Sequence, residues 1–307
     1  MPKQILLLQD LGISSEEVIK EVKKLDYEVI DDPGKATPGD VEIIITVKKE
    51  VGRKQLEKFP NLKMVAVAFT GYDSVDLEAC QERDIAVYNV PHYATNSVAE
   101  LAVGLAISLL REIPEADQIV KDKKWELKPG QDLKDKTIGI VGTGAIGIAT
   151  ARLFKAFGCK ILGWSRSEHD EFKNLGGSYI KDKKEFFAKA DIVSVHLPLT
   201  EETKGSIAKE ELEAMKKTGF IINTARGPII NESDLIMVLK NQKIAGAAID
   251  VFDTEPVKPD NELLTLDNVI LTPHIAFNTE EALNRRAKVT FKNIKDFQDG
   301  KKGNRVG

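Results

Sequence analysis

The sequence predicts an α/β protein in which parallel strands alternate with covering helices. Short, almost continuously apolar runs of strand length recur along the chain with helical patterns between them, which is typical of parallel sheets buried on both faces. With 42% hydrophobic and 30% charged residues, the 307-residue chain can form a sizeable core beneath a solvated surface. This composition excludes a disordered or fibrous protein, and the length corresponds to about two average domains.

Charge and cysteine content exclude several further classes of protein. The 44 Lys and Arg residues against 48 Asp and Glu residues give a net charge of −4, so nucleic acid and anionic membrane are not expected as partners. The apolar run Ile5–Leu8 is far shorter than the ~20 residues that cross a bilayer, and it does not resemble a signal peptide. Cys80 and Cys159 fit neither a disulfide framework nor a zinc site, so we expect two buried hydrophobic side chains and no metal. These features predict a cytoplasmic protein.

The expected strands form two series along the chain. The first series is predicted at Gln4–Gln9, Val41–Thr46, Met64–Ala68 and Ala86–Tyr88. The second series is predicted at Thr137–Val141, Lys160–Trp164, Asp191–Leu197, Gly219–Asn223, Ile244–Asp250 and Val269–Leu271. Helical patterns lie between them, for example at Glu16–Leu25 after the candidate capping residues Ser14 and Ser15, and at Arg53–Phe59.

Two long helical patterns interrupt this alternation and indicate where the domains join. The first begins at Ser97, where Glu100 three residues later predicts a capping box, and Pro114 is expected to kink or restart it. The second extends from about Thr279 to about Asp299, where a glycine follows.

A glycine-rich turn is the strongest local motif. It directly follows the strand Thr137–Val141 and opens the helical pattern Ala149–Phe157, and its residues are Gly142, Thr143, Gly144, Ala145, Ile146 and Gly147. Gly142 permits a tight turn, Gly144 lets backbone approach a pyrophosphate, and Gly147 allows close packing of helix and strand. Because the helix N-terminus offers unpaired N–H groups to phosphates, we interpret this turn as a dinucleotide site rather than a structural turn.

The end of the next strand carries information about the type of dinucleotide. A site for NAD usually has an acidic residue there, which binds the ribose hydroxyls of the adenosine. This chain has Ser165, Arg166 and Ser167 instead. The sequence therefore favours a pocket for the 2′-phosphate of NADP over an exposed polar turn, and NAD stays possible.

Four histidines limit the choice of a general acid. His92 is interpreted as a loop residue and His169 as an exposed one, while His196 ends a buried strand where it can border a cofactor. His274 differs because it lies just past the last strand, and ligands bind beyond the carboxyl ends of parallel strands.

Charged residues follow two further strands of the second series. Arg226 lies in Asn223-Thr224-Ala225-Arg226-Gly227, and Glu255 lies in the segment that begins at Asp250. An arginine, an acid and a histidine at successive strand ends favour a catalytic site over separate surface salt bridges.

The motifs VGTGAIG, HLPLTEETKGSI, INTARGPII, GAAIDVFDTEP and LTPHIA, in this order, resemble the D-isomer-specific 2-hydroxyacid dehydrogenases. The resemblance covers essentially the whole chain. It implies a Rossmann cofactor domain, residues 98–275, inserted into a smaller flavodoxin-like α/β substrate domain made of residues 1–97 and 276–307. It also implies a homodimer and reversible hydride transfer between a small 2-oxo acid and its D-2-hydroxy acid.

The resemblance implies roles for the individual residues. Arg226 would hold the substrate carboxylate and oxo group, His274 would donate a proton to the carbonyl oxygen, and Glu255 would bind the other imidazole nitrogen. Asp250 would lie on the nicotinamide side. Further contacts would come from Thr70 and Gly71 to the substrate and from His196, Pro198, Thr203 and Thr224 to the cofactor.

Two departures from the common family pattern bear on specificity. No acid stands at Ser165, and Phe69 and Phe277 are bulkier than the residues of many relatives, which predicts a reshaped substrate pocket. Within the enzyme class, glyoxylate/hydroxypyruvate reductase, D-lactate dehydrogenase and phosphoglycerate dehydrogenase stay open. Outside it, the alternatives are an NAD(P)-sensing corepressor-like protein on the same fold and a nucleoside-binding hydrolase.

Overall fold

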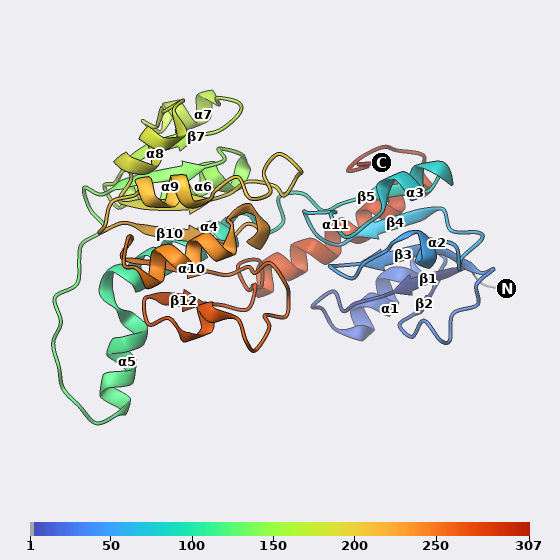
Figure 1. Cartoon of the computed structure of the whole chain (residues 1–307). Coiled ribbons are helices and arrows are strands. Elements are labelled where there is room, and N and C mark those ends of the chain that lie inside the picture. The colour runs from blue at the N-terminus through green and yellow to red at the C-terminus, as the bar shows by residue number, and fades with distance from the viewer. Residues whose placement is uncertain (1–2) are drawn as a thin grey trace. The chain divides into compact units, whose positions relative to one another are not determined.

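The computed structural model describes residues 3–307, which form two compact units (Figure 1). Unit 1 contains the residues up to Ala94 together with Asn278–Gly307, and unit 2 is the continuous segment Thr95–Phe277. Unit 2 is thus inserted into the chain of unit 1, with divisions a few residues from those that the resemblance implied.

Unit 1 is built on a five-stranded parallel sheet with the strand order β2-β1-β3-β4-β5. Its strands are β1 (Gln4–Leu7), β2 (Glu28–Ile30), β3 (Val41–Thr46), β4 (Met64–Val67) and β5 (Ala86–Tyr88). This is the flavodoxin-like order of doubly wound sheets. The predicted fold class is confirmed for this unit.

The helices of unit 1 are α1 (Ser15–Lys23), α2 (Arg53–Leu56), α3 (Leu77–Glu82) and α11 (Glu280–Gln298). All except α2, which follows Gly52, begin at polar capping residues. Ser14 and Glu17 form a capping box at α1, and the Thr279 side chain accepts a hydrogen bond from the backbone of Ala282 at α11. The predicted last helix is confirmed, and Gly300 follows it with φ +72°.

Unit 2 contains a seven-stranded parallel sheet with the order β12-β11-β10-β9-β6-β7-β8. Its strands are β6 (Thr137–Val141), β7 (Lys160–Trp164), β8 (Ser178–Tyr179), β9 (Ile192–Val195), β10 (Phe220–Asn223), β11 (Gly246–Ile249) and β12 (Val269–Leu271). From β6 the chain moves outward to β8 and then returns to β9, so the strand order reverses between β6 and β9. This is the Rossmann order, extended by one strand, and dinucleotides bind at such a reversal.

The helices of unit 2 are α4 (Thr95–Arg111), α5 (Ile113–Lys121), α6 (Ala145–Ala156), α7 (Asp170–Asn174), α8 (Lys183–Lys189), α9 (Lys209–Ala214) and α10 (Glu232–Lys240), with 3₁₀ turns at Gly227–Ile229 and Glu262–Thr265. Helices other than α5 cover both faces of the sheet. One apolar cluster includes Phe186 and Leu235, and a second includes Leu105 and Phe154. The apolar strands are therefore buried on both sides, as their sequence indicates.

The predicted start of the first long helix was wrong. Helix α4 begins at Thr95, so Ser97 lies inside the first turn, where it and Val98 are buried. Ser97 is therefore not the N-terminal cap of this helix. The predicted break at Pro114 is confirmed, because Glu112 has φ +46° and α5 starts at the next residue.

The cysteines agree with their prediction from the sequence, whereas two edge strands were not predicted. Cys80 and Cys159 are buried free thiols, and burial raises the pKa of each to about 11, which confirms their interpretation as small hydrophobic side chains. The edge strands β2 and β8 were not predicted, because β2 opens with the charged Glu28 and β8 has only two residues, so neither forms an apolar run. Within residues 3–307, no helix has the length and apolar character required to span a membrane.

Candidate active site

The glycine turn after β6 has the backbone geometry that its sequence predicts. Gly142 has φ +90°, and a Cβ there would lie 2.6 Å from the His196 carbonyl oxygen. A Cβ on Gly147 would lie 2.0 Å from the Gly142 carbonyl oxygen, so only glycine lets the first turn of α6 pack this closely on β6.

The same turn leaves open space at the N-terminus of α6. A Cβ on Gly144 would meet no atom within 4 Å, and this N-terminal capping residue, as a glycine, has no side chain to form a capping bond. Ala145 and Ile146 form the first turn of α6, where backbone N–H groups have no partner within the helix. An exposed helix N-terminus of this kind, at the point where the strand order reverses, has the geometry to bind an anion.

Two buried polar atoms border this edge of the sheet without a hydrogen-bond partner among residues 3–307. They are Nδ1 of His196 and the hydroxyl of Thr224, which follow β9 and β10. Burial lowers the pKa of His196 to about 3, so its ring is neutral near pH 7, and its Nε2 lies 2.9 Å from the Ser194 hydroxyl. Because buried polar atoms are normally satisfied, the two atoms fit a polar ligand such as a dinucleotide.

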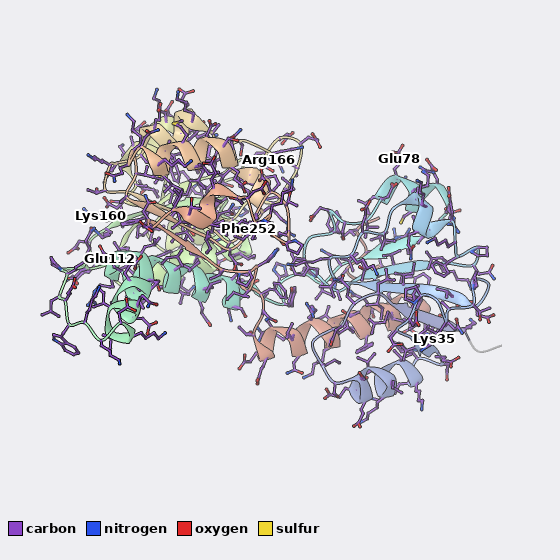
Figure 2. All side chains as sticks on the ribbon, turned by 60° about the horizontal axis from the view of Figure 1, so that its bottom comes forward. Lys35, Glu78, Glu112, Lys160, Arg166 and Phe252 are labelled. Carbon is purple, nitrogen blue, oxygen red and sulfur yellow. The ribbon has the colours of Figure 1, made fainter. Side chains whose placement is uncertain are left out.

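The loop after β7 places its residues at the surface of unit 2. Arg166 lies on the outside (Figure 2), 89% exposed, and its Nη1 is 3.7 Å from Oε2 of Glu202. The neighbouring Glu168 is engaged elsewhere, because its carboxylate lies 2.8 Å from Nζ of Lys173 and the pKa of Glu168 is lowered by this hydrogen bond. Ser165 is half-buried and Ser167 is exposed.

Thr203 and Pro198 are brought together on a turn at the same edge of the sheet. The Thr203 hydroxyl donates a hydrogen bond to the Pro198 carbonyl oxygen at 2.6 Å, and it accepts one from the backbone of Thr200. Hydrogen bonds of the Thr203 side chain therefore stabilise the turn after β9.

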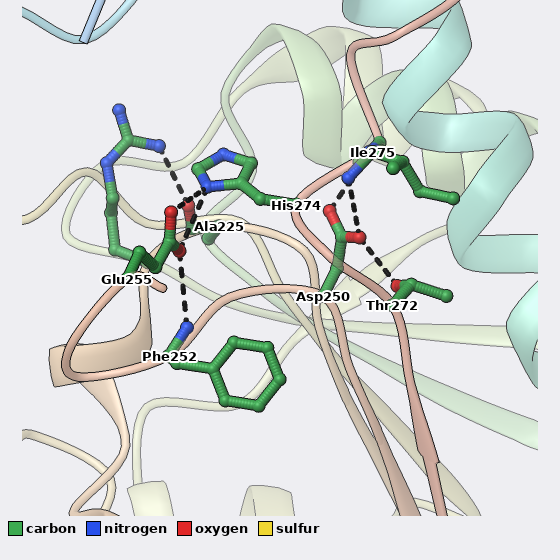
Figure 3. A network of polar contacts seen from close by, with 9 residues as sticks. Ala225, Asp250, Phe252, Glu255, Thr272, His274 and Ile275 are labelled. Atoms are coloured by element: carbon green, nitrogen blue, oxygen red, sulfur yellow. Dashed lines mark hydrogen bonds and ion pairs between the residues drawn. The ribbon is translucent and has the colours of Figure 1, made fainter. Parts of the chain in front are cut away.

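His274 and Glu255 form a close pair (Figure 3). The imidazole Nδ1 lies 2.7 and 2.9 Å from the two carboxylate oxygens, and Phe252 donates its backbone N–H to the same carboxylate at 3.3 Å. The side chain of His274 is 12% exposed. A carboxylate on Nδ1 orients the ring so that Nε2 is the atom directed toward a reacting group.

The buried Asp250 carboxylate fixes the loop that carries His274. Its Oδ1 accepts hydrogen bonds from the Thr272 hydroxyl at 2.6 Å and the Ile275 backbone at 2.8 Å, and its Oδ2 accepts one from the Ala276 backbone at 3.0 Å. His274 itself has φ +54°, an uncommon conformation for this residue type that these bonds hold in place. Asp250 therefore determines where the imidazole lies.

Arg226 projects from a loop that Asn223 shapes. The Asn223 side chain accepts a hydrogen bond from the Ala225 backbone at 3.0 Å and donates one to the Arg226 carbonyl oxygen at 2.9 Å. The Arg226 Nη1 donates to the Ala225 carbonyl oxygen at 2.8 Å. A Cβ on Gly227 would lie only 2.1 Å from the carbonyl carbon of Phe252, so glycine lets the Arg226 loop cross against the loop that leads to Glu255.

Asn223 and Gly227 were not predicted as part of this site. Both flank the candidate arginine in the sequence NTARGP, where the only available signal is their small size and turn-forming character.

The other two histidines are His92 in unit 1 and His169 in unit 2. His92 and His169 are both exposed, as expected for His169, and His92 lies in a turn of unit 1 with φ +62°, which agrees with its interpretation as a loop residue. The ring of Phe277 packs edge-on against His274 with centroids 5.7 Å apart, so one of the two bulky phenylalanines contacts the candidate proton donor directly.

Unit 1 places Thr70 and Gly71 at the carboxyl edge of its own sheet, just after β4. The Thr70 hydroxyl donates to the Val90 carbonyl oxygen at 3.0 Å, and the Asn89 side chain donates to the Thr70 carbonyl oxygen at 2.7 Å. Phe69 is buried beneath this turn.

Comparisons with known proteins agree with this geometry. Residues 103–276 match the model of the D-isomer specific 2-hydroxyacid dehydrogenase, NAD binding domain. A glyoxylate reductase from Thermococcus litoralis is 38% identical over 304 residues, covering 93% of this chain and 91% of that protein.

Two solved structures are similar over almost the whole chain. An NADPH-dependent glyoxylate/hydroxypyruvate reductase from Sinorhizobium meliloti has a TM-score of 0.88 and 30% identity, with 99% of this chain and 98% of that chain covered. A D-lactate dehydrogenase from Aquifex aeolicus, complexed with NAD and lactic acid, has a TM-score of 0.87 and 29% identity, with 99% of both chains covered.

Proposed function

Since the chain belongs to the D-isomer-specific 2-hydroxyacid dehydrogenase family, we propose that it acts mainly as a reductase of a small 2-oxo acid, with His274 as the proton donor. It is an NAD(P)-dependent oxidoreductase that interconverts 2-oxo and 2-hydroxy acids. The observation that carries the assignment of the proton donor is the His274–Glu255 pair, held at 2.7 Å by a loop that a buried aspartate fixes.

The residues around the glycine turn fit a nicotinamide dinucleotide. The open cradle at Gly144 and the N-terminus of α6 would hold the pyrophosphate, and the unpaired polar atoms of His196 and Thr224 would bind the nicotinamide half. When bound, the reduced nicotinamide supplies the hydride for the carbonyl carbon of the substrate. A neutral His196 suits this place, because it adds no charge that would oppose formation of the positively charged oxidised ring.

His274 would deliver the proton that completes the reduction. As hydride reaches the carbonyl carbon, negative charge develops on the oxygen, and the imidazole Nε2–H stabilises it and then transfers its proton. Glu255 holds the opposite nitrogen, so the ring presents this atom in one orientation and its positive charge is compensated before transfer. In the oxidative direction the same nitrogen would accept the hydroxyl proton.

Arg226 would bind the substrate carboxylate and oxo group. A planar guanidinium makes two parallel hydrogen bonds to a carboxylate, which fixes the orientation of a small substrate as well as its charge. For Thr70 and Gly71 of unit 1 we propose backbone contacts to the carboxylate.

NADPH would be preferred over NADH because of the loop after β7. Arg166 can pair with a 2′-phosphate that carries about −1.5 to −2 charges, and no acid at Ser165 holds the ribose hydroxyls or repels that phosphate. A hydrogen bond to a charged group contributes ~1.5–3 kcal/mol, which corresponds to a preference of 10- to 100-fold. We expect about 10-fold, since Arg166 is 89% exposed and its charge is screened. Because the similar solved structures include both an NADPH-dependent reductase and a dehydrogenase complexed with NAD, this preference rests on the loop itself.

A panel of 2-oxo acids assayed with NADH and NADPH in parallel tests the proposal. Glyoxylate, hydroxypyruvate and pyruvate should be reduced with consumption of the cofactor, and a chiral product should have the D configuration. Phosphohydroxypyruvate serves as the comparison for a phosphorylated substrate. No turnover of any 2-oxo acid with either cofactor, despite measurable cofactor binding, would contradict the proposal and favour a nucleotide-sensing role.

A homodimer is proposed from an exposed apolar surface of unit 2. No residue of α5 is buried, and α5 and the segment after it extend from the body of this unit (Figure 1). Trp125 and Leu127 in this segment are 83% and 90% exposed, and Ile113 and Val120 add to the apolar area. Because large apolar side chains in one contiguous segment usually mark an interface, we expect a second copy of the chain to cover them. Trp125→Ser with Leu127→Ser should convert a dimer into a monomer in light scattering, whereas a wild-type monomer would contradict this part of the proposal.

A further inference from the structure

A single tyrosine hydroxyl joins the two parts of the candidate cofactor site in unit 2. Tyr179 lies on the short edge strand β8, and its hydroxyl is 2.8 Å from the Thr143 hydroxyl in the glycine turn. It also accepts a hydrogen bond at 3.0 Å from the backbone N–H of His169, three residues after Arg166. From this geometry we propose that Tyr179 is a positioning residue that couples the pyrophosphate turn to the Arg166 loop and thereby determines the preference for NADPH. The inference rests on the proposed function of these two segments.

The Tyr179 ring is fixed by packing, so its hydroxyl has a defined place. It pairs in register with Gly163 of β7, and its ring centroid lies 4.9 Å from that of Phe172. A Cβ on Gly163 would come within 2.7 Å of the Phe172 ring and 3.0 Å of the Tyr179 ring. A glycine in β7 therefore creates the space in which the aromatic pair lies across the strand.

The hydrogen-bonding capacity of the hydroxyl is used on both sides. Because the His169 N–H can only donate, the tyrosine oxygen is an acceptor there, and its own proton remains available for the Thr143 oxygen. Thr143 is completely buried and has no solvent to replace this partner. Loss of the tyrosine hydroxyl thus leaves a buried threonine hydroxyl and a backbone N–H without this partner.

The coupling matters because the side chain of Arg166 is itself only weakly held. Arg166 itself has only the long contact of 3.7 Å to Glu202, between two side chains that are 89% and 80% exposed. The segment is instead held from both ends: the N–H of Gly142 in the glycine turn donates to the Trp164 carbonyl oxygen at 2.8 Å, and His169 binds Tyr179. Arg166 lies between these two attachments. Release of the second one leaves the guanidinium free to sample positions away from a 2′-phosphate.

Tyr179→Phe tests this inference, because it keeps the ring packing and removes only the hydroxyl. We expect the Kd for NADPH, measured by calorimetry or by nucleotide fluorescence, to rise about 5- to 20-fold, while the Kd for NADH rises no more than about 2-fold. At saturating NADPH, kcat should stay close to wild type, since the reacting atoms are not touched. An equal rise for both cofactors, or no change for either, would overturn the inference.

Thr143 provides a second variant at the other end of the bond. Thr143→Ser keeps a hydroxyl and should keep the NADPH preference, whereas Thr143→Val keeps the shape without the hydroxyl and should lower it in the same direction as Tyr179→Phe. If Tyr179→Phe does not fold, this pair decides the question alone, and equal NADPH-to-NADH Kd ratios for the serine and valine variants would contradict the coupling.

Tyr88→Phe is the matched control, because it removes a hydroxyl that donates to the Lys301 carbonyl oxygen in unit 1. Its cofactor affinities should not change.

Arg166→Ala separates the inference from the function on which it rests. If Tyr179 acts through this loop, Tyr179→Phe should have little further effect on NADPH affinity in the Arg166→Ala background, so that the two changes are not additive. Additive losses would overturn the proposed route. If Arg166→Ala leaves the ratio of the two Kd values unchanged, the proposed 2′-phosphate contact fails, whereas the ratio for Tyr179→Phe alone still decides whether the tyrosine affects selectivity.

Discussion

The His274 loop and the Arg166 loop leave the same carboxyl edge of the unit 2 sheet, yet the structure holds them very differently. The first is fixed by three hydrogen bonds to the buried Asp250 and by two close contacts to Glu255. Arg166 lies in the second loop with an exposed side chain and one long ion pair. The rigid loop suits chemistry, which tolerates little displacement, and the exposed loop suits discrimination between two similar cofactors.

The difference indicates where substitutions should change the reaction and where they should change only the choice of cofactor. Changes around His274 should lower turnover with both cofactors alike. Changes around Arg166 should alter the ratio of affinities and leave the chemical step intact.

Gly227→Ala should have the largest effect on the rigid region. Its Cβ would lie 2.1 Å from the Phe252 carbonyl carbon, so the Arg226 loop and the Glu255 loop would have to separate. Because a displacement of ~1 Å can cost about 10²-fold in rate, we expect turnover to fall by about 10²-fold or more with either cofactor. Steady-state assays measure this, and Gly104→Ala is the control, because Gly104 is exposed on helix α4 and a Cβ there meets nothing within 4 Å. Wild-type turnover in Gly227→Ala would show that the crossing of the loops is dispensable.

Arg226→Lys tests whether the fork of the guanidinium is required. The lysine retains the charge but cannot make two parallel bonds to a carboxylate, so kcat should fall and KM for the 2-oxo acid should rise, together lowering kcat/KM by roughly 10²-fold. Cofactor Kd values should stay unchanged. Full activity in the lysine variant would mean that a single positive charge suffices and that the proposed pair of hydrogen bonds from Arg226 to the substrate carboxylate is wrong.

Asp250→Asn should weaken the support of the His274 loop. An amide NH₂ would face one of the three donors that now bind the carboxylate, so at least one buried hydrogen bond would be lost. We expect a loss of ~1–3 kcal/mol in unfolding free energy, measured in urea, together with about a 10-fold lower kcat. Unchanged stability with lower activity would instead indicate a direct role of Asp250 in the reaction.

In the cofactor-free protein, His196→Gln should change the pH dependence of stability. Burial lowers the pKa of the folded-state histidine to about 3, whereas the unfolded value is about 6.5. The contribution of His196 is therefore fully present above about pH 6.5 and is lost as the pH falls toward 3, by up to ~1.4 kcal/mol per pH unit.

Urea unfolding at pH 7, 6, 5 and 4 measures this slope. It should be shallower in His196→Gln than in the wild type and unchanged in His169→Gln, where the ring is exposed. Identical slopes in all three proteins would show that His196 is not held neutral by burial.

Much of this architecture could be predicted from the sequence, because apolar strands and the glycine turn are local signals. Gly142, Gly144 and Gly147 carry their geometry in the motif itself, and Arg226, Glu255 and His274 follow recognisable strands. The position of each functional side chain depends on contacts that no periodicity encodes. Asp250, predicted to face the nicotinamide, has both carboxylate oxygens bonded to the His274 loop. Tyr179 lies 36 residues from Thr143, on a strand too short to predict, so their hydrogen bond becomes visible only in the folded chain.

The most direct test of the account measures His274→Gln and Arg166→Ala side by side, with kcat and the Kd for NADPH and NADH determined for each. His274→Gln should lose ~10²–10⁴ in kcat, the usual contribution of a general acid, while both Kd values stay at wild type. Arg166→Ala should keep kcat at saturating cofactor and lose the roughly 10-fold preference for NADPH. Near-wild-type turnover in His274→Gln would contradict the assignment of the proton donor. A loss of NADH and NADPH affinity alike in Arg166→Ala would contradict the division between a fixed catalytic loop and a selective cofactor loop.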